Sequence, residues 1–512
     1  MPWWWLVVLA CSPRSVEVPA ERPNVVVVMW DTVRADRMSL YGHTRATTPH
    51  VDAWARSAKV YERAISPGMW TVPAHASLFT GKMPTTHGAN ADWIWLDDHH
   101  QTLAEQLKEH GYATWAYSSN PYVSDRSHLL QGFEEVAYSW RGPLAEATGA
   151  ATRAKLLPED ASVELGPNWP KEASGRGWPE HLTSHKDGAP VGVETFLEWV
   201  DSRERADTPF FAYLNFLEAH HPRVPTLEAR EAILTEEELA AGLATDASLF
   251  RIFSAMEGKG ALSDEENAAM AGVYDATLVD LDRATGALLE GLERRGITED
   301  TVVVLVSDHG EHLGEHGLYD HRWSLHEPLV HVPLVISWPG HISAGREARP
   351  VSTLGLFASL LDWTGTPTPA GVETSGLDVP KDRVHAELVA PMPRHASVRN
   401  AFTDLDPKRW SRRFHGVYEG SWKLLRASDG RHRLYDLGSD PAERYDRADT
   451  DRDRAKTMNA HGRTWQSVLP TYDASLRGAE DHPRPALRPD DPERARLEAL
   501  GYVEPEIEGG TP

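Results

Sequence analysis

Two apolar, β-branched runs constrain the fold of this chain more than any other feature of its sequence. Residues 24–30 read NVVVVMW, and residues 301–306 read TVVVLV. Neither run alternates between apolar and polar side chains, so each has the pattern of a strand that is buried on both faces. Such strands are typical of parallel sheets covered by helices on both sides. The two runs therefore predict a layered α/β protein.

Other segments continue this pattern, because strand-like and helix-like stretches alternate along the chain. Further strands are expected at 113–118, 209–216 and 332–337, and helices at 103–112, 193–200 and 265–295. The helical assignments rest on apolar residues at a spacing of three or four, and the strand assignments on short apolar runs. The fold class predicted from this alternation is α/β, with a mostly parallel central sheet flanked by helices.

The domain division follows from two places where this alternation of strands and helices changes. Residues 141–190 are rich in Gly, Pro, Trp and charge, and they indicate an insertion within a main domain that spans 24–375. Beyond it, short strand-like pieces separated by turn residues predict a small antiparallel subdomain at 376–482. Its strands are expected at 414–418, 422–425 and 433–437, before a C-terminal helix (492–500) and loose tail that make up 483–512.

Composition narrows the class of partner. The formal net charge of −24 argues against nucleic acid or an anionic membrane surface, because both need a basic face. It does not exclude a small anionic substrate, since a bound metal ion can invert the local potential. With 512 residues, of which 41% are hydrophobic, the chain has ample apolar surface to fold, and two domains are the simplest expectation.

The N-terminus resembles a bacterial lipoprotein signal. Residues 3–10 form a short apolar stretch that ends in Leu-Ala before Cys11, which is the one cysteine of the chain. Lipidation of Cys11 would make 1–23 a signal and tether, and would place the protein outside the cytoplasm, in the bacterial cell envelope or periplasm. No Lys or Arg precedes the stretch, which is at the short end of the usual ~7–15 residues, so an ordinary buried or disordered N-terminus stays an alternative. No run reaches the ~20 apolar residues of a membrane-spanning helix, so membrane contact is expected only through the lipid.

Potential metal ligands directly follow both buried runs. Asp31 ends the first run, and Asp308 and His309 lie just past the second, where Gly310 permits a sharp turn. Ligands bind at the carboxyl ends of strands in open α/β sheets, so these positions carry weight. Taken alone, Asp31 is also compatible with a helix N-cap. The following Glu311, His312, Glu315, His316, His321 and His326 are expected mostly around the ligands or in solvent.

A third segment, TVPAHASLFTG at 71–81, opens with a hydroxyl residue. The stretch ASLF within it looks like the start of a helix. A helix N-terminus aimed at an anion, beside the hydroxyl of Thr71, suits phosphate or sulfate transfer. Thr before a helix is more often only a cap, so the segment by itself is weak evidence.

Together the three segments resemble the sulfatase family of the alkaline-phosphatase superfamily. The order is strand–Asp, then Thr-x-Pro-x-His-Ala-Ser-Leu-Phe-Thr-Gly, then strand–Ser-Asp-His-Gly. Similar stretches occur along 22–448, namely RPNVVVVMWDTVRADRMSLYGH, FFAYLNFLEAHHPRVP, LYDHRWSLHEPLVHVPLVI and WKLLRASDGRHRLYDLGSDPAER. The resemblance implies the superfamily fold and a metal-dependent hydrolase or transferase.

The resemblance also implies a site. Asp31, Asp308 and His309 match metal ligands, and Thr71 matches the nucleophile, which contacts the metal as well. Oxygen ligands with one imidazole suit a single divalent ion, which could be Mn²⁺, Mg²⁺, Ca²⁺ or Zn²⁺.

Three histidines match further catalytic positions of the family. His220 matches a histidine that touches the transferring group or protonates the leaving group, and His321 falls near a basic substrate position. His75 stands where sulfatases have the arginine of their motif, and packing of the helix start is the alternative for it.

Two departures from the family shift the expected chemistry. Thr32 occupies the position where many sulfatases have a second aspartate. Thr71 cannot be oxidised to formylglycine, because its β-carbon is secondary, whereas a metal-bound threonine alkoxide is a competent nucleophile. With threonine at the nucleophile position, the chain resembles relatives that act on phosphate esters and diesters. These are nucleotide pyrophosphatase/phosphodiesterases, lipoteichoic acid synthases and phosphoethanolamine transferases.

We therefore expect transfer at a phosphate or sulfate ester through a covalent Thr71 intermediate, with phosphate favoured. The expected substrate is a small anionic ester, for which a lipid or a glycan conjugate is a candidate carrier. The alternative is a catalytically silent, sulfatase-like binding protein of the envelope.

Overall fold

The computed structural model describes residues 22–156, 186, 188–204, 207–392, 401–406 and 408–476. The lipoprotein signal with Cys11, most of the insertion and the helix expected at 492–500 lie outside these residues. The domain boundaries proposed from the sequence stay predictions.

The main sheet has nine strands in the order β11-β2-β10-β6-β1-β5-β3-β4, with β9 beside β2. At its centre, β6, β1, β5 and β3 run parallel, so their carboxyl ends meet at one edge. The β10 strand is antiparallel to both of its neighbours. The strands are β1 (Asn24–Trp30), β2 (Lys59–Ile65), β3 (Ala113–Ser118), β4 (Glu135–Tyr138), β5 (Phe210–Phe216), β6 (Thr301–Val306), β9 (His331–Val332), β10 (Leu334–Ser337) and β11 (Gly345–Ser352).

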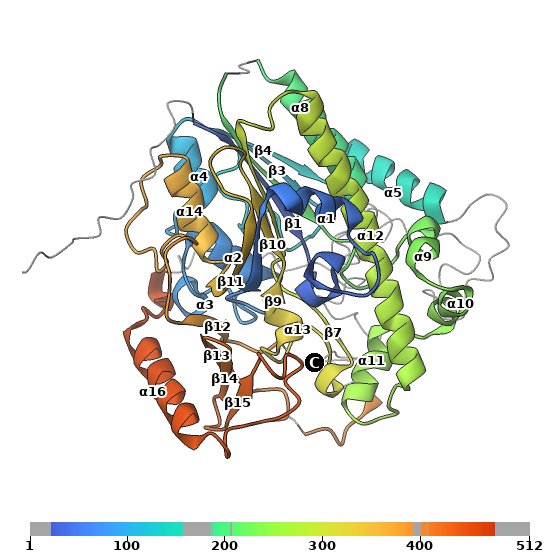
Figure 1. Ribbon diagram of the computed structural model, residues 1–512, viewed down its shortest axis with the longest axis vertical. Coiled ribbons are helices and arrows are strands. Elements are labelled where there is room, and N and C mark those ends of the chain that lie inside the picture. The colour runs from blue at the N-terminus through green and yellow to red at the C-terminus, as the bar shows by residue number, and fades with distance from the viewer. Residues whose placement is uncertain are drawn as a thin grey trace, which may run out of the picture.

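Helices cover both faces of this sheet (Figure 1). One face is covered by α2 (Thr71–Thr80), α4 (Leu103–Glu109) and α14 (Gly355–Trp363), and the other by α1 (Pro49–Trp54), α8 (Gly188–Ser202) and α12 (Asp264–Arg294). Along β1, Val25 and Val27 pack into the first layer, whereas Val26 and Val28 pack into the second. Burial on both faces explains why the run is apolar throughout, and it confirms the predicted α/β class.

Shorter elements connect these layers. They are α3 (Pro84–His87), α5 (Gly142–Leu156), α9 (Leu227–Ile233), α10 (Glu236–Ala244), α11 (Leu249–Met256), α13 (Glu327–Val330), the strand pair β7 (His312–Leu313) and β8 (Tyr319–Asp320), and the 3-10 turns η1 (Ala35–Arg37), η2 (Ser39–Tyr41), η3 (Ala55–Ser57), η4 (Glu315–Gly317) and η5 (Ala474–Leu476). Within the described ranges, no single helix has the length and apolar composition needed to cross a membrane, and only α10 and α11 meet that test as a bent pair.

The small antiparallel sheet predicted near the C-terminus is present. It consists of β12 (Val384–Leu388), β13 (Phe414–Glu419), β14 (Trp422–Ala427) and β15 (His432–Asp436), and α16 (Arg452–Val468) packs on it. A buried ion network joins the sheet to the main domain. Lys423 Nζ lies 2.9 Å from both Glu327 Oε1 and Glu443 Oε1, and His326 Nδ1 lies 2.9 Å from Glu443 Oε2.

Candidate active site

Three of the predicted metal ligands converge at the carboxyl edge of the sheet. Asp31 directly follows β1, and Asp308 and His309 follow β6, the strand beside it. One ligand atom from each of the three lies within 4.8 Å of the others, and all three side chains are buried. Neighbouring parallel strands deliver their ends to one place, which is why residues so distant in sequence meet.

The Asp31 carboxylate is oriented by side-chain amides and a hydroxyl. Thr32 Oγ1 donates to Oδ1 at 2.7 Å. Asn120 Nδ2 donates to Oδ2 at 2.7 Å, and Asn215 Nδ2 approaches the same oxygen at 3.4 Å. These donors leave Oδ1 facing His309 Nε2 at 4.0 Å.

Asp308 presents one oxygen to the same space. Its Oδ1 accepts the backbone N–H groups of Thr32 at 3.1 Å and His309 at 2.8 Å. Its Oδ2 is buried and has no hydrogen-bond partner among the described residues. Burial and the nearby charge of Asp31 raise the pKa of the Asp308 carboxyl well above its ordinary value. A buried carboxylate oxygen without a partner is unfavourable unless a cation meets it.

His309 has the tautomer that a metal ligand requires. Its Nδ1–H donates to the carbonyl of Gly310 at 2.9 Å, so the lone pair of Nε2 points at the carboxylates. Nε2 lies 3.2 Å from Asp308 Oδ2. Burial lowers the pKa of His309 well below its ordinary value, which keeps the ring neutral. Two carboxylates and a neutral imidazole, arranged in this way, fit one divalent cation.

Thr71 lies beside this cluster as the first residue of α2. The helix begins at Thr71 itself, ahead of the stretch ASLF from which the sequence predicts its start, and Trp70 occupies the N-cap position. The side chain of Thr71 is therefore not a helix cap. Its Oγ1 lies 3.4 Å from His309 Nε2 and 3.5 Å from Asn120 Nδ2, and it is buried. The hydroxyl thus faces the candidate metal ligands at the N-terminus of a helix, where anions are favoured.

His321 lies against the cluster as a cation. Its ring centroid is 4.4 Å from that of His309. Burial lowers the pKa of His321, but Asp320 and Glu311, at 3.0 Å and 3.2 Å from Nδ1, outweigh that effect and raise it to about 10. The ring is therefore protonated at neutral pH.

His220 and His75 lie on different sides of the cluster. The ring centroid of His220 is 5.1 Å from that of His321, and its Nδ1 donates to the carbonyl of His221 at 2.6 Å. His75 Nδ1 donates to the carbonyl of Thr71 at 2.8 Å and lies 3.4 Å from Asp308 Oδ2. The ring of His75 also packs edge-on against Tyr213. His75 thus holds the first turn of α2 from within the core. The catalytic roles of all these residues stay predictions.

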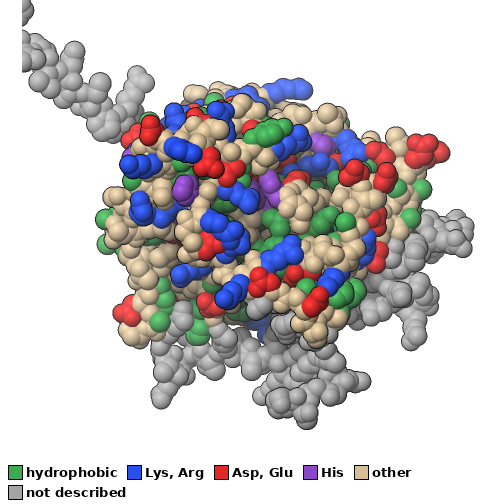
Figure 2. All heavy atoms as spheres, turned by 90° about the horizontal axis from the view of Figure 1, so that it is seen from below, with side chains coloured by type: hydrophobic (Ala, Val, Ile, Leu, Met, Phe, Trp, Pro, Cys, Tyr) green, Lys and Arg blue, Asp and Glu red, His purple; other side chains and the backbone are tan. Residues whose placement is uncertain are grey.

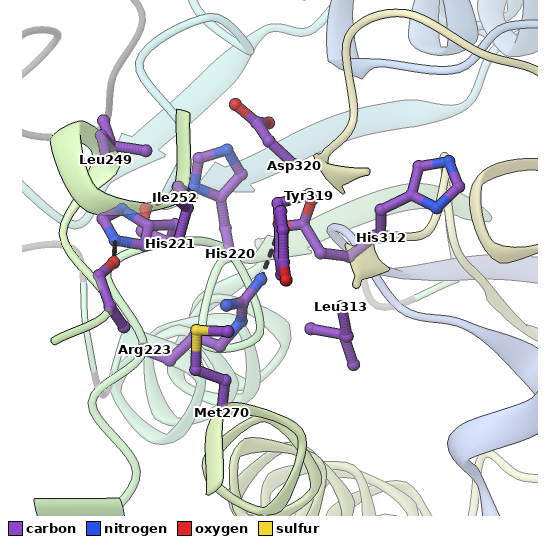
Figure 3. Close-up of a pocket in the computed structure, with 12 residues that line it drawn as sticks. His220, His221, Arg223, Leu249, Ile252, Met270, His312, Leu313, Tyr319 and Asp320 are labelled. Carbon is purple, nitrogen blue, oxygen red and sulfur yellow. Dashed lines mark hydrogen bonds and ion pairs between the residues drawn. The ribbon is translucent and has the colours of Figure 1, made fainter. Parts of the chain in front are cut away.

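A small cavity lies behind His220 (Figure 3). Its volume of about 20 Å³ is enough for one water molecule. In its wall, Arg223 pairs with Glu311 Oε2 at 2.6 Å, while the other oxygen of Glu311 faces His321. Arg223 therefore fixes the carboxylate that holds His321 protonated.

Sequence reasoning missed Asn120, Asn215 and Lys186. Asp31 was identified because it is a polar residue directly after a buried strand. Asn120 lies just beyond β3, so the same rule could have identified it. Lys186 Nζ donates to the carbonyls of Leu217 at 2.8 Å and His220 at 2.7 Å, and burial lowers its pKa to about 7. No pattern around Lys186 in the sequence signals this contact.

The comparison with known families agrees with this geometry. Residues 23–366 match the family described as Sulfatase. The chain belongs to the sulfatase family. Residues 314–463 of this sulfatase-family chain also match the family described as N-sulphoglucosamine sulphohydrolase, C-terminal.

Curated relatives are distant in sequence but cover most of the chain. An N-acetylglucosamine-6-O-sulfatase of Bacteroides thetaiotaomicron is 23% identical, over 85% of this chain and 84% of the relative. An ulvan-active sulfatase of Formosa agariphila is 26% identical, over 72% of this chain and 68% of the relative. The predicted enzyme class, a sulfatase-like hydrolase, is confirmed by these relatives together with the family match.

Solved structures confirm the fold. The phosphonate monoester hydrolase of Agrobacterium radiobacter aligns with a TM-score of 0.63 at 20% identity, over 87% of this chain and 95% of that one. A protein solved in complex with its substrate D-glucosamine-2-N,6-O-disulfate aligns with a TM-score of 0.62 at 17% identity, over 88% of this chain and 99% of that one.

Proposed function

We propose that this sulfatase-family protein cleaves or transfers phosphate or sulfate esters through a covalent intermediate on Thr71, and that it prefers phosphate. One observation carries the proposal: the Thr71 hydroxyl lies at a helix N-terminus and faces Asp31, Asp308 and His309 at the carboxyl edge of the sheet.

Asp31, Asp308 and His309, with Thr71 beside them, would hold one divalent ion, and the buried Asp308 Oδ2, which accepts no hydrogen bond from the described residues, is one of the oxygens available to it. When bound, such an ion would lower the pKa of the threonine hydroxyl and offset negative charge on the ester oxygens.

The protein's own groups then define the reaction. Thr71 loses its hydroxyl proton to solvent, and its Oγ1 forms a bond to the phosphorus or sulfur atom while the bond from that atom to the alcohol oxygen of the ester breaks. The alcohol oxygen takes up a proton and leaves. Water or a second alcohol attacks the same atom and releases Thr71. Protonated His321 is suited to stabilise charge on the transferring group or to protonate the leaving oxygen. His220, whose ring packs edge-on against His321, acts with it on the charge of the leaving group. His75 donates to the carbonyl of Thr71 and holds the first turn of α2.

The preference for phosphate follows from the nucleophile. Formylglycine requires a primary carbon bearing sulfur or oxygen, and the β-carbon of Thr71 is secondary. The aldehyde-hydrate route to sulfate esters is therefore closed to this chain, whereas direct attack by the threonine oxygen remains open.

The substrate class is inferred from relatives. Those named above include sulfatases of N-acetylglucosamine and of ulvan, and a hydrolase of phosphonate monoesters. These relatives support an anionic ester carried on a glycan, and the lipid conjugate considered from the sequence is the second candidate.

The test combines a substrate panel with mass analysis. Aryl sulfate, aryl phosphate, bis-aryl phosphate and phosphonate monoester are each supplied with Mn²⁺, Mg²⁺, Ca²⁺ or Zn²⁺. Intact protein quenched during turnover should carry a phosphoryl-sized adduct that maps to Thr71. Turnover of the sulfate ester alone would refute the phosphate preference, and turnover without an adduct on Thr71 would refute the mechanism.

We also propose export and lipid attachment at Cys11. Labelled palmitate should be incorporated into the wild type in a bacterial host and lost in Cys11→Ala. An unlabelled wild type would overturn this proposal.

A further inference from the structure

A second, larger cavity lies between the main domain and the small antiparallel sheet. Its volume is about 330 Å³, at the lower end of the range of ligand pockets, about 300–1,000 Å³. One wall comes from the chain segment around Trp323 and His326, and the opposite wall from β14, β15 and the residues before β13. Figure 2 shows the molecule from below, where Lys and Arg side chains surround a hollow that also exposes hydrophobic side chains.

The lining of this cavity is basic, although the chain as a whole is strongly acidic. Its described walls contain four arginines and no carboxylate side chain. The arginines are Arg409, Arg412, Arg431 and Arg433.

Nearby carboxylates neutralise only part of this charge. Asp429 is shared by Arg412 at 3.0 Å and Arg431 at 2.6 Å. Glu257 lies 3.5 Å from Arg409, and no described carboxylate forms an ion pair with Arg433. The cavity therefore has more cationic side chains than carboxylates near them. This local excess of positive charge contrasts with the net negative charge of the whole chain, which repels anions.

Aromatic rings form the floor of the cavity and are held in place. Trp323 and Trp410 pack with their ring centroids 5.0 Å apart. Trp323 Nε1 donates to the carbonyl of Met392 at 2.8 Å, and Trp410 Nε1 donates to Glu257 Oε1 at 2.7 Å. Indole rings whose N–H groups are already satisfied offer apolar contact to the C–H face of a sugar ring.

The cavity and the candidate active site share one chain segment. His321 faces the metal-ligand cluster, and Trp323, two residues later, lines the cavity. Their Cα atoms are therefore within about 7 Å of each other. The buried network of Lys423, Glu327, Glu443 and His326 fixes the small sheet against this same segment. A substrate with charged groups on successive sugars would contact the cluster and the cavity on the two sides of this segment.

We propose that this cavity binds a sugar ring bearing a sulfate or phosphate ester, as a subsite for a second charged group of a polyanionic glycan. The arginines bind the ester and the tryptophan floor contacts the ring. This inference rests on the proposed function only in assigning the cavity and the active site to the same substrate.

Binding is measured separately from catalysis. In the Thr71→Ala protein, calorimetric titration with a sulfated glycosaminoglycan tetrasaccharide should give saturable binding, and the desulfated tetrasaccharide should bind far more weakly. Arg412→Ala combined with Arg433→Ala should weaken binding of the sulfated form by roughly tenfold or more. Replacement of both arginines by lysine, which keeps the charge, should restore part of the affinity.

The matched control is Arg56→Ala with Arg294→Ala, which removes two exposed charges away from the cavity and should leave binding unchanged. Equal binding by the cavity variant and the wild type, or equal binding of the desulfated sugar, would overturn the subsite. The control variant should also turn over a small aryl ester at the wild-type rate. Failure of all four aryl esters with the wild type would count against the proposed function, while the titration would still decide the subsite.

Discussion

Thr32 shows how one strained residue organises the site. Its φ of 67° is unusual for a β-branched residue and costs about 1–3 kcal/mol. In that conformation its N–H reaches Asp308 Oδ1 and its Oγ1 reaches Asp31 Oδ1. Its carbonyl accepts a hydrogen bond from Tyr274 at 2.8 Å. Thr32, which stands where many sulfatases have a second aspartate, thus orients both carboxylates rather than adding a third.

The hydroxyl of Thr71 is expected to be indispensable. Thr71→Ala should lower kcat on the best ester of the panel by roughly 10³-fold or more, because it removes the attacking oxygen. Thr71→Ser should retain activity within about tenfold, because the oxygen stays in place. Steady-state kinetics measure both changes, and circular dichroism checks that both variants fold. An alanine variant as active as the wild type would contradict the assignment.

Helices α2 and α3 are joined by a buried histidine with one permitted tautomer. His87 Nδ1 accepts the N–H of Ala89 at 3.1 Å, so Nε2 carries the proton and donates to Ser77 Oγ, also at 3.1 Å. Protonation would break the bond to Ala89. Burial, together with the nearby His100, lowers the pKa of His87 to about 3.

This contact predicts an acid-sensitive fold. The pKa of His87 is lower in the native state than in the unfolded chain, so between pH 6.5 and 3 the unfolded state binds more protons. The stabilisation is complete above pH 6.5 and falls by about 1.4 kcal/mol per pH unit below it. The free energy of unfolding, measured with urea at several pH values, should fall less steeply with decreasing pH in His87→Gln than in the wild type. His341→Gln, at an exposed position, should keep the wild-type slope, and equal slopes in all three proteins would refute the prediction.

The small sheet depends on Lys423 for its attachment. Lys423 is fully buried between Glu327 and Glu443. Lys423→Met should leave buried carboxylates without a counter-charge and cost about 3–5 kcal/mol of unfolding free energy. Lys108→Met removes an exposed pair with Glu134 and should cost less than about 1 kcal/mol. Chemical unfolding followed by tryptophan fluorescence compares the two, and a similar cost in both would contradict the role of the network.

Metal binding should stabilise the whole molecule. The native fold assembles Asp31, Asp308 and His309 from two strands, and the unfolded chain does not, so a cation bound there favours the folded state. At one hundred times the Kd, the gain is about 2.7 kcal/mol. Calorimetry should show a higher Tm with Mn²⁺ than with chelator, and Asp308→Asn should abolish most of the difference. An unchanged Tm with each of the four candidate ions would argue against a metal site here.

Much of the fold and part of the candidate site were accessible from sequence patterns. The runs 24–30 and 301–306 identify central strands, because burial on both faces demands an unbroken apolar stretch. Asp31, Asp308 and His309 are predictable for a related reason: parallel strands end at a common edge, so a polar residue just past each strand lies near its counterparts. The antiparallel β10 was not foreseen, since an apolar run has no marker of its direction.

Local pattern therefore defines the elements and the ends of the strands, because hydrophobic burial acts residue by residue along the chain. Contacts between segments with no shared pattern depend on the topology. Asn120 reaches Asp31, Lys186 reaches the loop of His220, and Arg412 and Arg433 meet Trp323 only because the folded chain carries each pair of segments to the same place. The role of the Thr71 hydroxyl also depends on the tertiary structure. The hydroxyl is a candidate nucleophile rather than a helix cap because α2 begins at Thr71 and lies against the ends of β1 and β6.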